Sequence, residues 1–440
     1  MTGVLKSDVL GGRDHLAFQS DGLAVEGKSC AELAERYGTP LYVLSERSIR
    51  HNYRSFRDAL VKYYPNVLVC PAYKANSHLA VCRLYEIEGA GAEVVSSGEL
   101  RTALDIGVAP ERIVFNGPVK TKADLELAVS SGVGLVNADS VSELDRMQDA
   151  ARVVGKRCNV GIRVNIGIAP KTHPYLATAE KESKFGVGIE DAVAAYKEAV
   201  KRSELNVIGI HSHIGSSLYE PDVIREMSKR VLKLSMTINE ETGLSMLKID
   251  LGGGLAFPYE VTSPRMSCNE YAAAILGNNG TTLEKLKNPR LIFEPGRSIV
   301  ADSGILLTRV HVLKRQGDVN WAMVDAGMNT FIRPALYGAK HQIILANQRQ
   351  AEETRYSIGG PCCESGDVLG KNVALPTLYK EDLLAILDVG AYGFTMSNNY
   401  NGQARPAVVL VSEDEAQLIR RRETYEEMVV DEIIPPKLTK

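Results

Sequence analysis

Residues 67–88, VLVCPAYKANSHLAVCRLYEIE, determine how the rest of the chain is interpreted. The apolar run at 67–73 is typical of a buried strand, and apolar residues at helical spacing follow, with Ser77 as the expected N-cap. Lys74 stands where the predicted strand ends. A lysine at such a place either extends to water or, if partly desolvated, supplies a neutral amine that can form a Schiff base. One strand followed by one helix is the unit to look for elsewhere in the chain.

The same alternation of strand and helix recurs as far as about residue 298. Eight short apolar runs end in polar or glycine-rich residues, at 67–73, 92–96, 112–116, 134–137, 159–165, 207–213, 247–251 and 291–294. The helices expected between them include 77–88, 98–106, 122–131, 140–154, 190–201 and 222–242. This α/β pattern is what a closed parallel (β/α)8 barrel of the TIM type requires. An open doubly wound sheet would give the same alternation, although no GxGxxG follows the first strand.

After about residue 301 the pattern changes. Apolar runs of β character occur at 305–313, 321–324, 355–358, 383–389 and 407–412, with only short helical pieces between them. They predict a second, mostly antiparallel β-domain, sandwich-like or barrel-like, which the amino-terminal strands complete. We therefore expect amino-terminal strands at 1–44, a (β/α)8 barrel at 45–300 and a carboxy-terminal β-domain at 301–440. The charged segment after Glu413 is expected to end the sheet and to run over the surface.

Composition excludes several classes of function. A chain of 440 residues with 45% hydrophobic and 24% charged residues is typical of a soluble protein with two domains. The net charge of −3, without a basic block, gives no sign of nucleic-acid binding. No apolar run approaches the ~20 residues of a membrane span, and the amino terminus lacks the apolar core of a secretory signal. Seven scattered cysteines without zinc-ligand spacing favour reduced thiols in the cytoplasm and no metal site.

Chemically versatile residues stand at the carboxyl ends of the predicted strands, which form the working face of such a barrel. They are Lys74 after the first strand, His211 and His213 at the end of the sixth, the glycines 252–254 after the seventh and Glu294 to Arg297 after the eighth. Three consecutive glycines leave backbone N–H groups unshielded, which suits a phosphate group. Taken singly, such residues are more often a flexible turn, a surface ion pair or a core histidine. Together, an amine, a flat ring, a phosphate loop and a carboxylate describe a pyridoxal phosphate site.

Seven motifs, in the same order, make the chain resemble the diaminopimelate decarboxylases, which belong to the alanine-racemase-like (fold-type III) class of pyridoxal phosphate enzymes. Four lie in the predicted barrel: YKAN at 73–76, HSHIGS at 211–216, GGG at 252–254 and EPGR at 294–297. Three lie in the predicted β-domain: RPALY at 333–337, CESGD at 363–367 and GAYG at 390–393. The resemblance covers about 37–410. It implies a carbon–carbon lyase that converts meso-2,6-diaminopimelate to L-lysine and carbon dioxide, the last step of lysine biosynthesis.

The resemblance also implies how pyridoxal 5′-phosphate would be bound. Lys74 would hold the cofactor's aldehyde, and His213 would stack on its ring. Glu294 would face the ring nitrogen, where a racemase of this fold is expected to carry an arginine. The full set of expected cofactor-binding residues is Lys74, His213, Ser216, Gly253, Gly254, Glu294, Pro295, Gly296, Arg297 and Tyr392.

Catalysis and substrate choice are likewise implied by the resemblance. Cys363 resembles the family's proton donor and would act beside Lys74. The expected substrate-binding residues are Arg297, Arg333, Tyr337, Glu364 and Tyr392. Diaminopimelate carries a second amine and a second carboxylate, which an acid and a planar cation can bind. Ornithine and lysine lack that carboxylate, so a desolvated arginine would disfavour them. In the family, the loop with Cys363 and Glu364 reaches the partner's active site, which implies a homodimer.

Other interpretations stay open at this point. Glu93 stands where the family often carries aspartate, and Cys362 precedes the expected proton donor where an aliphatic residue is usual. Residues 181–186, KESKFG, match the family's mobile loop over the site. The chain could instead decarboxylate another amino acid, with a D-amino-acid centre, ornithine or lysine, or a carrier-bound substrate. It could also be a non-catalytic homologue, against which the presence of Lys74, Glu294 and Cys363 argues.

Overall fold

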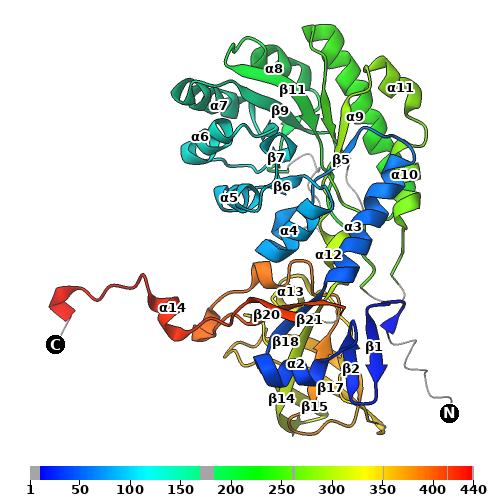
Figure 1. Ribbon diagram of the computed structural model, residues 1–440, viewed down its shortest axis with the longest axis vertical. Coiled ribbons are helices and arrows are strands. Elements are labelled where there is room, and N and C mark those ends of the chain that lie inside the picture. Colours follow the sequence, from blue (N-terminus) through cyan, green and yellow to red (C-terminus); the bar gives the residue numbers. More distant parts are fainter. Residues whose placement is uncertain (1–9, 169–182, 260–262, 350, 414, 439–440) are drawn as a thin grey trace. The chain divides into compact units, whose positions relative to one another are not determined.

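The computed structural model describes residues 10–168, 183–259, 263–349, 351–413 and 415–438 (Figure 1). The chain divides into two compact units. One, here called the β unit, comprises Met1–Ile49, Tyr259–Thr262 and Val300–Lys440, and the other, the barrel unit, comprises Arg50–Pro258 and Ser263–Ile299. Within the described ranges, no helix is both long and apolar enough to cross a membrane.

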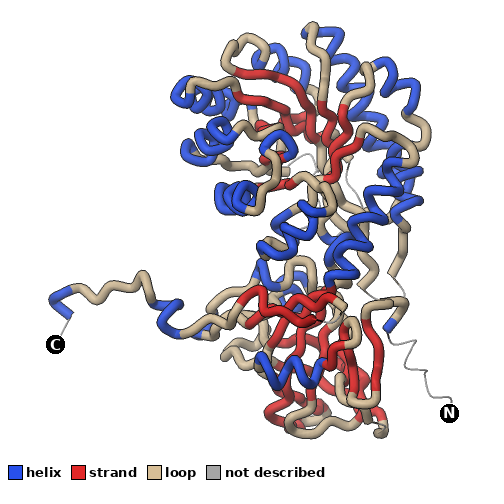
Figure 2. Tube along the Cα trace, in the orientation of Figure 1, coloured by secondary structure: helices blue, strands red, loops and turns tan. Residues whose placement is uncertain are grey.

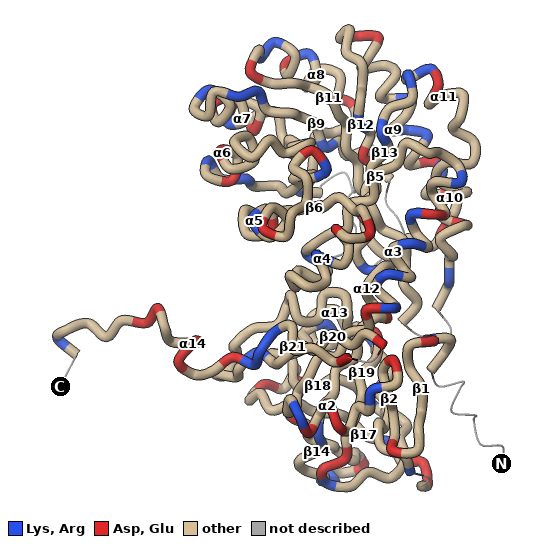
Figure 3. The backbone as a smooth tube through the Cα atoms, viewed as in Figure 1, with Lys and Arg blue, Asp and Glu red and all other residues tan. Residues whose placement is uncertain are grey.

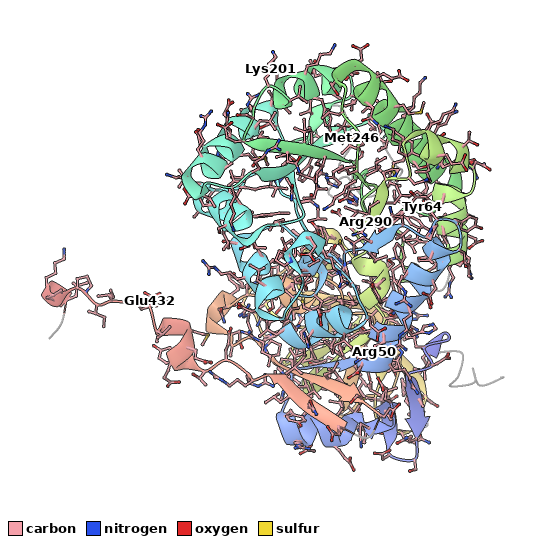
Figure 4. The ribbon with its side chains drawn as sticks, turned by 45° about the horizontal axis from the view of Figure 1, so that its top comes forward. Arg50, Tyr64, Lys201, Met246, Arg290 and Glu432 are labelled. Atoms are coloured by element: carbon pink, nitrogen blue, oxygen red, sulfur yellow. The ribbon has the colours of Figure 1, made fainter. Side chains whose placement is uncertain are left out.

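The barrel unit is built on a parallel sheet whose helices lie outside it (Figures 1 and 2). Its strands are β5 (Val67–Val69), β6 (Ala92–Val94), β7 (Ile113–Phe115), β8 (Leu135–Ala138), β9 (Cys158–Asn165), β11 (Leu205–His211), β12 (Lys248–Asp250) and β13 (Arg290–Phe293), with the short β10 (Val187–Gly188) beside β9. They pair in the order β5-β13-β12-β11-β9-β8-β7-β6. The labels Met246 and Arg290 in Figure 4 mark the amino-terminal side of β12 and β13.

Hydrogen bonds between β5 and β6 join the two ends of this sheet. The Gly91 N–H donates to Val69 O (2.9 Å), and the Glu93 N–H donates to Pro71 O (3.1 Å). Ala72 and Glu93 form a parallel bridge at the same place. The prediction of a closed (β/α)8 barrel is therefore confirmed, and the open doubly wound alternative is wrong.

The helices that alternate with the strands are α3 (Glu46–Val61), α4 (Leu79–Ile87), α5 (Ser97–Asp105), α6 (Lys122–Ser131), α7 (Val141–Val154), α8 (Ala192–Ala199), α9 (Pro221–Thr242), α10 (Cys268–Leu276), α11 (Gly280–Lys285) and α12 (Arg297–Val300). Local sequence sets their ends. Thr121 and Asp124 form a capping box at the start of α6, and Gly132 ends that helix in the left-handed conformation. Inside the barrel, one apolar cluster joins side chains of β5, β7, β8, β11 and β13 with Cys70. Because these strands are not all neighbours, the cluster fills the barrel interior.

The β unit is a mostly antiparallel sheet in the order β18-β17-β15-β14-β4-β20-β21, with β19 paired to β14 and β16 to β19. Its strands are β4 (Leu41–Ser45), β14 (Gly304–Gln316), β15 (Val319–Val324), β16 (Ile343–Leu345), β17 (Glu353–Gly359), β18 (Val368–Pro376), β19 (Leu383–Ile386), β20 (Ala407–Ser412) and β21 (Glu415–Arg420). A smaller sheet holds β1 (Leu16–Gln19), β2 (Gly22–Val25) and β3 (Lys28–Ser29). The helices are α2 (Cys30–Tyr37), α13 (Arg333–Tyr337) and α14 (Tyr425–Val429).

The amino-terminal strands complete this unit, as predicted. β4 lies between β14, to which it is antiparallel, and β20, to which it is parallel. Leu16, Leu23 and Val25 from the small sheet belong to the same apolar core as Val43 of β4 and Val409 of β20. Over both units, Lys and Arg are interspersed with Asp and Glu (Figure 3), in keeping with the small net charge.

Three local predictions were wrong. The first strand ends at Val69 and not at residue 73, because Pro71 has no N–H to continue the ladder. Ser77 is not an N-cap: a 3-10 turn, η1 (Tyr73–Ala75), intervenes, and α4 begins only after His78. The segment after Glu413 does not simply run over the surface. It returns as the edge strand β21, which pairs antiparallel with β20.

Candidate active site

Lys74 lies at the mouth of the barrel, at the carboxyl end of the strands. It belongs to the turn η1, just after β5. Its Nζ contacts Oε2 of Glu93 on β6. The Lys74 side chain is 43% exposed, whereas that of Glu93 is 1% exposed. The amine is therefore accessible from solvent yet anchored by a buried carboxylate, which suits a nucleophile that must meet a ligand.

Glu294 directly follows β13 and lies beside His211 and Asp250, all three of them buried. His211 Nε2 is 3.5 Å from Glu294 Oε2. Burial alone would raise the pKa of Glu294, but His211, Lys74 and a hydrogen bond with Asp250 lower this pKa well below its ordinary range. Burial and the charge of Glu294 raise the pKa of Asp250 well above its ordinary range. Asp250 therefore keeps the proton, and Glu294 stays an anion. Among the described residues, these three could also hold a metal ion, since one atom of each lies within 4.8 Å of the others.

His213 and the triple glycine lie against each other. The Gly253 N–H donates to His213 Nδ1 (3.3 Å). Burial, and then the charge of Arg163, lower the pKa of His213 to about 3, so its flat imidazole ring is neutral at physiological pH. A Cβ on Gly253 would lie 2.1 Å from Glu294 O, and one on Gly254, whose φ is +107°, would lie 2.5 Å from Gly215 O. The loop is thus closed to side chains and presents bare backbone.

Ser216 and Arg297 connect the loops that follow β11 and β13. Arg297 Nε donates to Ser216 Oγ (3.2 Å), and the arginine is 4% exposed. Pro295 O accepts from the Ala72 N–H (2.9 Å), which holds the loop containing Gly296 beside the turn that carries Lys74. Every predicted site residue of the barrel is therefore at one end of it, around an amine, an anionic carboxylate and a cationic guanidinium.

Sequence reasoning missed four polar residues of this end. They are Asn116, Asn137, Asp250 and Arg163, all buried. Asn116 and Asn137 were the last residues of the predicted third and fourth strands, so a polar residue at a strand end was a usable signal. Arg163 stacks on Phe185 (4.4 Å from the guanidinium carbon to the ring centre). Phe185 belongs to the predicted mobile loop, of which residues 181 and 182 lie outside the described part of the chain.

The β unit holds Arg333 in an aromatic surrounding. Arg333 begins α13 and is 5% exposed. Its guanidinium carbon lies 5.2 Å from the ring centre of Tyr259 and 5.7 Å from that of Tyr337. Arg333 Nε lies 3.5 Å from His341 Nε2, and His341 Nδ1 lies 2.9 Å from Leu387 O. Since that carbonyl can only accept, Nδ1 carries the proton and Nε2 is free to accept from Arg333. The arginine is thus pre-arranged to meet a planar anion.

The two adjacent cysteines of the β unit differ in environment. Cys362 is buried, donates to Asn329 Oδ1 (3.4 Å) and has a pKa raised by burial. Cys363 is exposed, and so is Glu364 beside it. The backbone at Cys363 is tied to Asn401 Oδ1 (2.7 Å). Tyr392, another expected site residue of the β unit, has a left-handed backbone, with φ of +55°. Of the pair, Cys363 is the thiol that can meet a reactant.

Comparison with known proteins places this arrangement. Residues 46–301 match the family described as pyridoxal-dependent decarboxylase, pyridoxal binding domain. Fold and site therefore define a pyridoxal-dependent decarboxylase.

Similar full-length proteins narrow the assignment. The chain is 40% identical to the diaminopimelate decarboxylase of Methanocaldococcus jannaschii over 97% of this chain and 98% of that protein. It is 41% identical to that of Pseudomonas aeruginosa over 96% of this chain and 100% of that protein. The crystal structure of the M. jannaschii protein with L-lysine superposes with a TM-score of 0.91 at 40% identity, covering 97% of this chain and 100% of that chain. The chain belongs to the diaminopimelate decarboxylase family.

Proposed function

We propose that this protein decarboxylates meso-2,6-diaminopimelate to L-lysine and carbon dioxide with pyridoxal 5′-phosphate as cofactor. The observation that carries the proposal is the buried carboxylate of Glu294 at the barrel mouth, 3.5 Å from His211 and bound by the Asn116 amide (2.5 Å). Its lowered pKa favours the anion. A carboxylate beside the ring nitrogen keeps that nitrogen protonated. The bound cofactor then supplies a cationic conjugated ring that accepts the electron pair released when carbon dioxide leaves.

The residues at the barrel mouth fit this cofactor. Lys74 would hold its aldehyde, because the amine is half-exposed and anchored by Glu93. His213 would lie against the ring, since a neutral flat imidazole can stack without adding charge. The phosphate would meet backbone N–H groups of Ser216, Gly254 and Gly296 and the guanidinium of Arg297. Gly253, whose N–H donates to His213 Nδ1, and Pro295, which has no N–H, would shape the two loops around it. Tyr392 is proposed as a further cofactor contact by resemblance.

Loss of carbon dioxide must be followed by protonation of the same carbon, which needs a donor. We assign that proton to Cys363, because it is the exposed thiol of the adjacent pair. Cys363 and Glu364 are exposed on their own subunit. This exposure supports a homodimer in which they complete the partner's site, with Tyr392 and Arg297 among the substrate contacts.

Substrate choice is assigned to Arg333, with Tyr337 and Glu364. The guanidinium of Arg333 is 5% exposed and lies beside the rings of Tyr259 and Tyr337. Its planar fork of N–H donors matches a carboxylate, so it favours a substrate with a distal carboxylate. Glu364 would bind the distal amine. L-Lysine and L-ornithine have no second, distal carboxylate to offer Arg333, which is the physical reason for preferring diaminopimelate.

The seven cysteines of the chain are all free thiols. Structural disulfides belong to oxidising compartments, and seven reduced thiols are usual in the cytoplasm. We infer that the enzyme acts in the cytoplasm.

The test is carbon dioxide release by the enzyme loaded with pyridoxal 5′-phosphate. We expect release from meso-diaminopimelate and little from L-lysine, L-ornithine or D-lysine. Lys74→Ala should abolish both turnover and the visible absorbance of the bound cofactor. Lys248→Ala is the matched control, because Lys248 is a partly buried lysine at the amino end of the same barrel, where its Nζ donates to Gly134 O (2.6 Å). Equal release from L-lysine, or a cofactor band that survives in Lys74→Ala, would contradict the proposal.

A further inference from the structure

Asn116 bridges two buried carboxylates at the barrel mouth. Its Nδ2 donates to Glu294 Oε1 (2.5 Å) and to Glu93 Oε1 (3.1 Å). Glu93 and Glu294 are 1% and 7% exposed, and Asn116 is 4% exposed. Two buried carboxylates within reach of one nitrogen repel each other, and a donor between them offsets part of that repulsion.

The bridge divides the oxygens of each carboxylate between partners. Asn116 binds the Oε1 atom of both. The Oε2 atom of Glu93 contacts Lys74, and the Oε2 atom of Glu294 faces His211. One side-chain amide therefore fixes the rotation of the carboxylate beside the reactive amine and of the carboxylate beside the proposed ring nitrogen.

A second asparagine fixes the amide itself. Asn137 Nδ2 donates to Asn116 Oδ1 (2.8 Å), so the Asn116 NH2 group must face the carboxylates. The buried Lys120 in turn donates to Asn137 O (2.8 Å) and to Glu143 Oε2 (3.0 Å). The backbone of Asn137 is thus held by a buried cation, and its side chain orients the amide that binds the two carboxylates.

We propose that Asn116 is a positioning residue, which aligns Glu93 and Glu294 for the two ends of the cofactor and is itself oriented by Asn137. This inference rests on the proposed function. A merely structural asparagine would stabilise the barrel without affecting how the cofactor is bound. A positioning asparagine would affect the cofactor even in variants that fold well.

The experiment measures pyridoxal 5′-phosphate binding by Asn116→Leu, a substitution of similar size without a donor. We expect about 10- to 100-fold weaker binding, the usual effect of losing a hydrogen bond to a charged group. A misaligned Glu294 also holds the ring proton less well. The visible spectrum of the bound cofactor should therefore change at a lower pH than in the unsubstituted protein.

Asn206→Leu is the matched control. Asn206 Nδ2 donates to Asn159 Oδ1 (2.8 Å), so this pair is also an asparagine–asparagine hydrogen bond of the barrel, but it lies at the amino ends of β9 and β11. The control should leave cofactor affinity and the spectral titration unchanged, whatever its effect on the melting temperature. If Asn116→Leu fails to fold, Asn137→Leu takes its place. It keeps the Asn116 amide but removes the hydrogen bond that orients this amide, so we expect cofactor binding to weaken by about 3- to 10-fold.

Two outcomes would overturn the inference. One is an Asn116→Leu protein, or in its place Asn137→Leu, with cofactor affinity and spectral titration like those of the unsubstituted protein. The other is an equal loss of affinity in Asn206→Leu. In both cases the unsubstituted enzyme would still bind the cofactor and act on diaminopimelate, so the proposed function would stand. If the unsubstituted protein never binds the cofactor, both the proposed function and the inference about Asn116 are wrong.

Discussion

Substituting Gly253 by alanine tests whether the backbone of the triple-glycine loop must lie where the structure has it. The added Cβ would be 2.1 Å from Glu294 O and 2.8 Å from Glu294 C, whereas ordinary contacts begin at 3.4 Å. The two backbone segments would have to separate by about 1.3 Å. That displacement breaks the hydrogen bond from the Glu294 N–H to Gly252 O (2.8 Å). Overpacking of this kind costs about 1–3 kcal/mol of stability.

The functional loss should exceed the stability loss, because Glu294 would move with the loop. A misplacement of this size lowers kcat by about 100-fold. The assay is carbon dioxide release at saturating cofactor, together with urea unfolding. Gly280→Ala is the control: Gly280 begins α11, has no neighbouring atom within 4 Å of an added Cβ and does not need a positive φ. It should leave kcat unchanged and stability equal or slightly higher. A Gly253→Ala enzyme with normal kcat and normal unfolding would refute the reasoning.

Three further substitutions probe the site and its support. Burial, and then the charge of Glu93, raise the pKa of Glu99 from its ordinary 4.5 to about 7. Ionised Glu99 therefore destabilises the folded protein, an effect that begins above pH 4.5 and is complete above pH 7. Glu99→Gln should therefore raise the unfolding free energy by about 1–3 kcal/mol at pH 8 and by nothing near pH 4.5, as urea titrations at both pH values would show. Lys120→Met leaves Glu143 buried without its cation and should cost about 3–5 kcal/mol in the same assay, part of which Glu143→Gln should restore in the double variant. Arg333→Ala should raise KM for diaminopimelate by about 10- to 100-fold with little change in cofactor affinity. Arg349→Ala, which removes another arginine stacked on a tyrosine, should leave KM unchanged. A similar rise in KM for the two variants would mean that Arg333 is structural.

The order of strands and helices in the barrel could be predicted because each strand and the helix after it carry their own periodic pattern of apolar residues. Runs such as 112–116 and 134–137 are short and mostly apolar, and each is followed by a helix with a polar N-cap, Thr121 and Ser140 respectively. The alternation of strands and helices predicted a closed barrel but did not by itself exclude an open sheet, because closure depends on two hydrogen bonds between β5 and β6 and not on a pattern along the chain. The edge strand β21 was missed because half of its six residues are charged or polar and none of them is buried.

The candidate site was predictable where a residue type is rare at its position and not where it is common. A lysine, three glycines and a Glu-Pro-Gly-Arg run stand out at strand ends. Asn116 carries only the general signal of a polar residue at a strand end, which asparagine shares with many turns, and its partners are known only from the two distances from its Nδ2. Asp250 reads as an ordinary strand residue, and its raised pKa arises from burial next to Glu294, which no sequence pattern encodes.

The hydrogen bonds that close the barrel, between β5 and β6, lie next to Lys74. The hydrogen bond from the Glu93 N–H to Pro71 O joins β6 to the segment that leads into Lys74, and the Glu93 side chain contacts that lysine. A ligand bound to Lys74 would therefore also stabilise the hydrogen bonds that close the barrel. Deuterium uptake at the amides of Gly91 and Glu93 should slow when pyridoxal 5′-phosphate is bound, while uptake at the opposite wall, between β9 and β11, should stay the same.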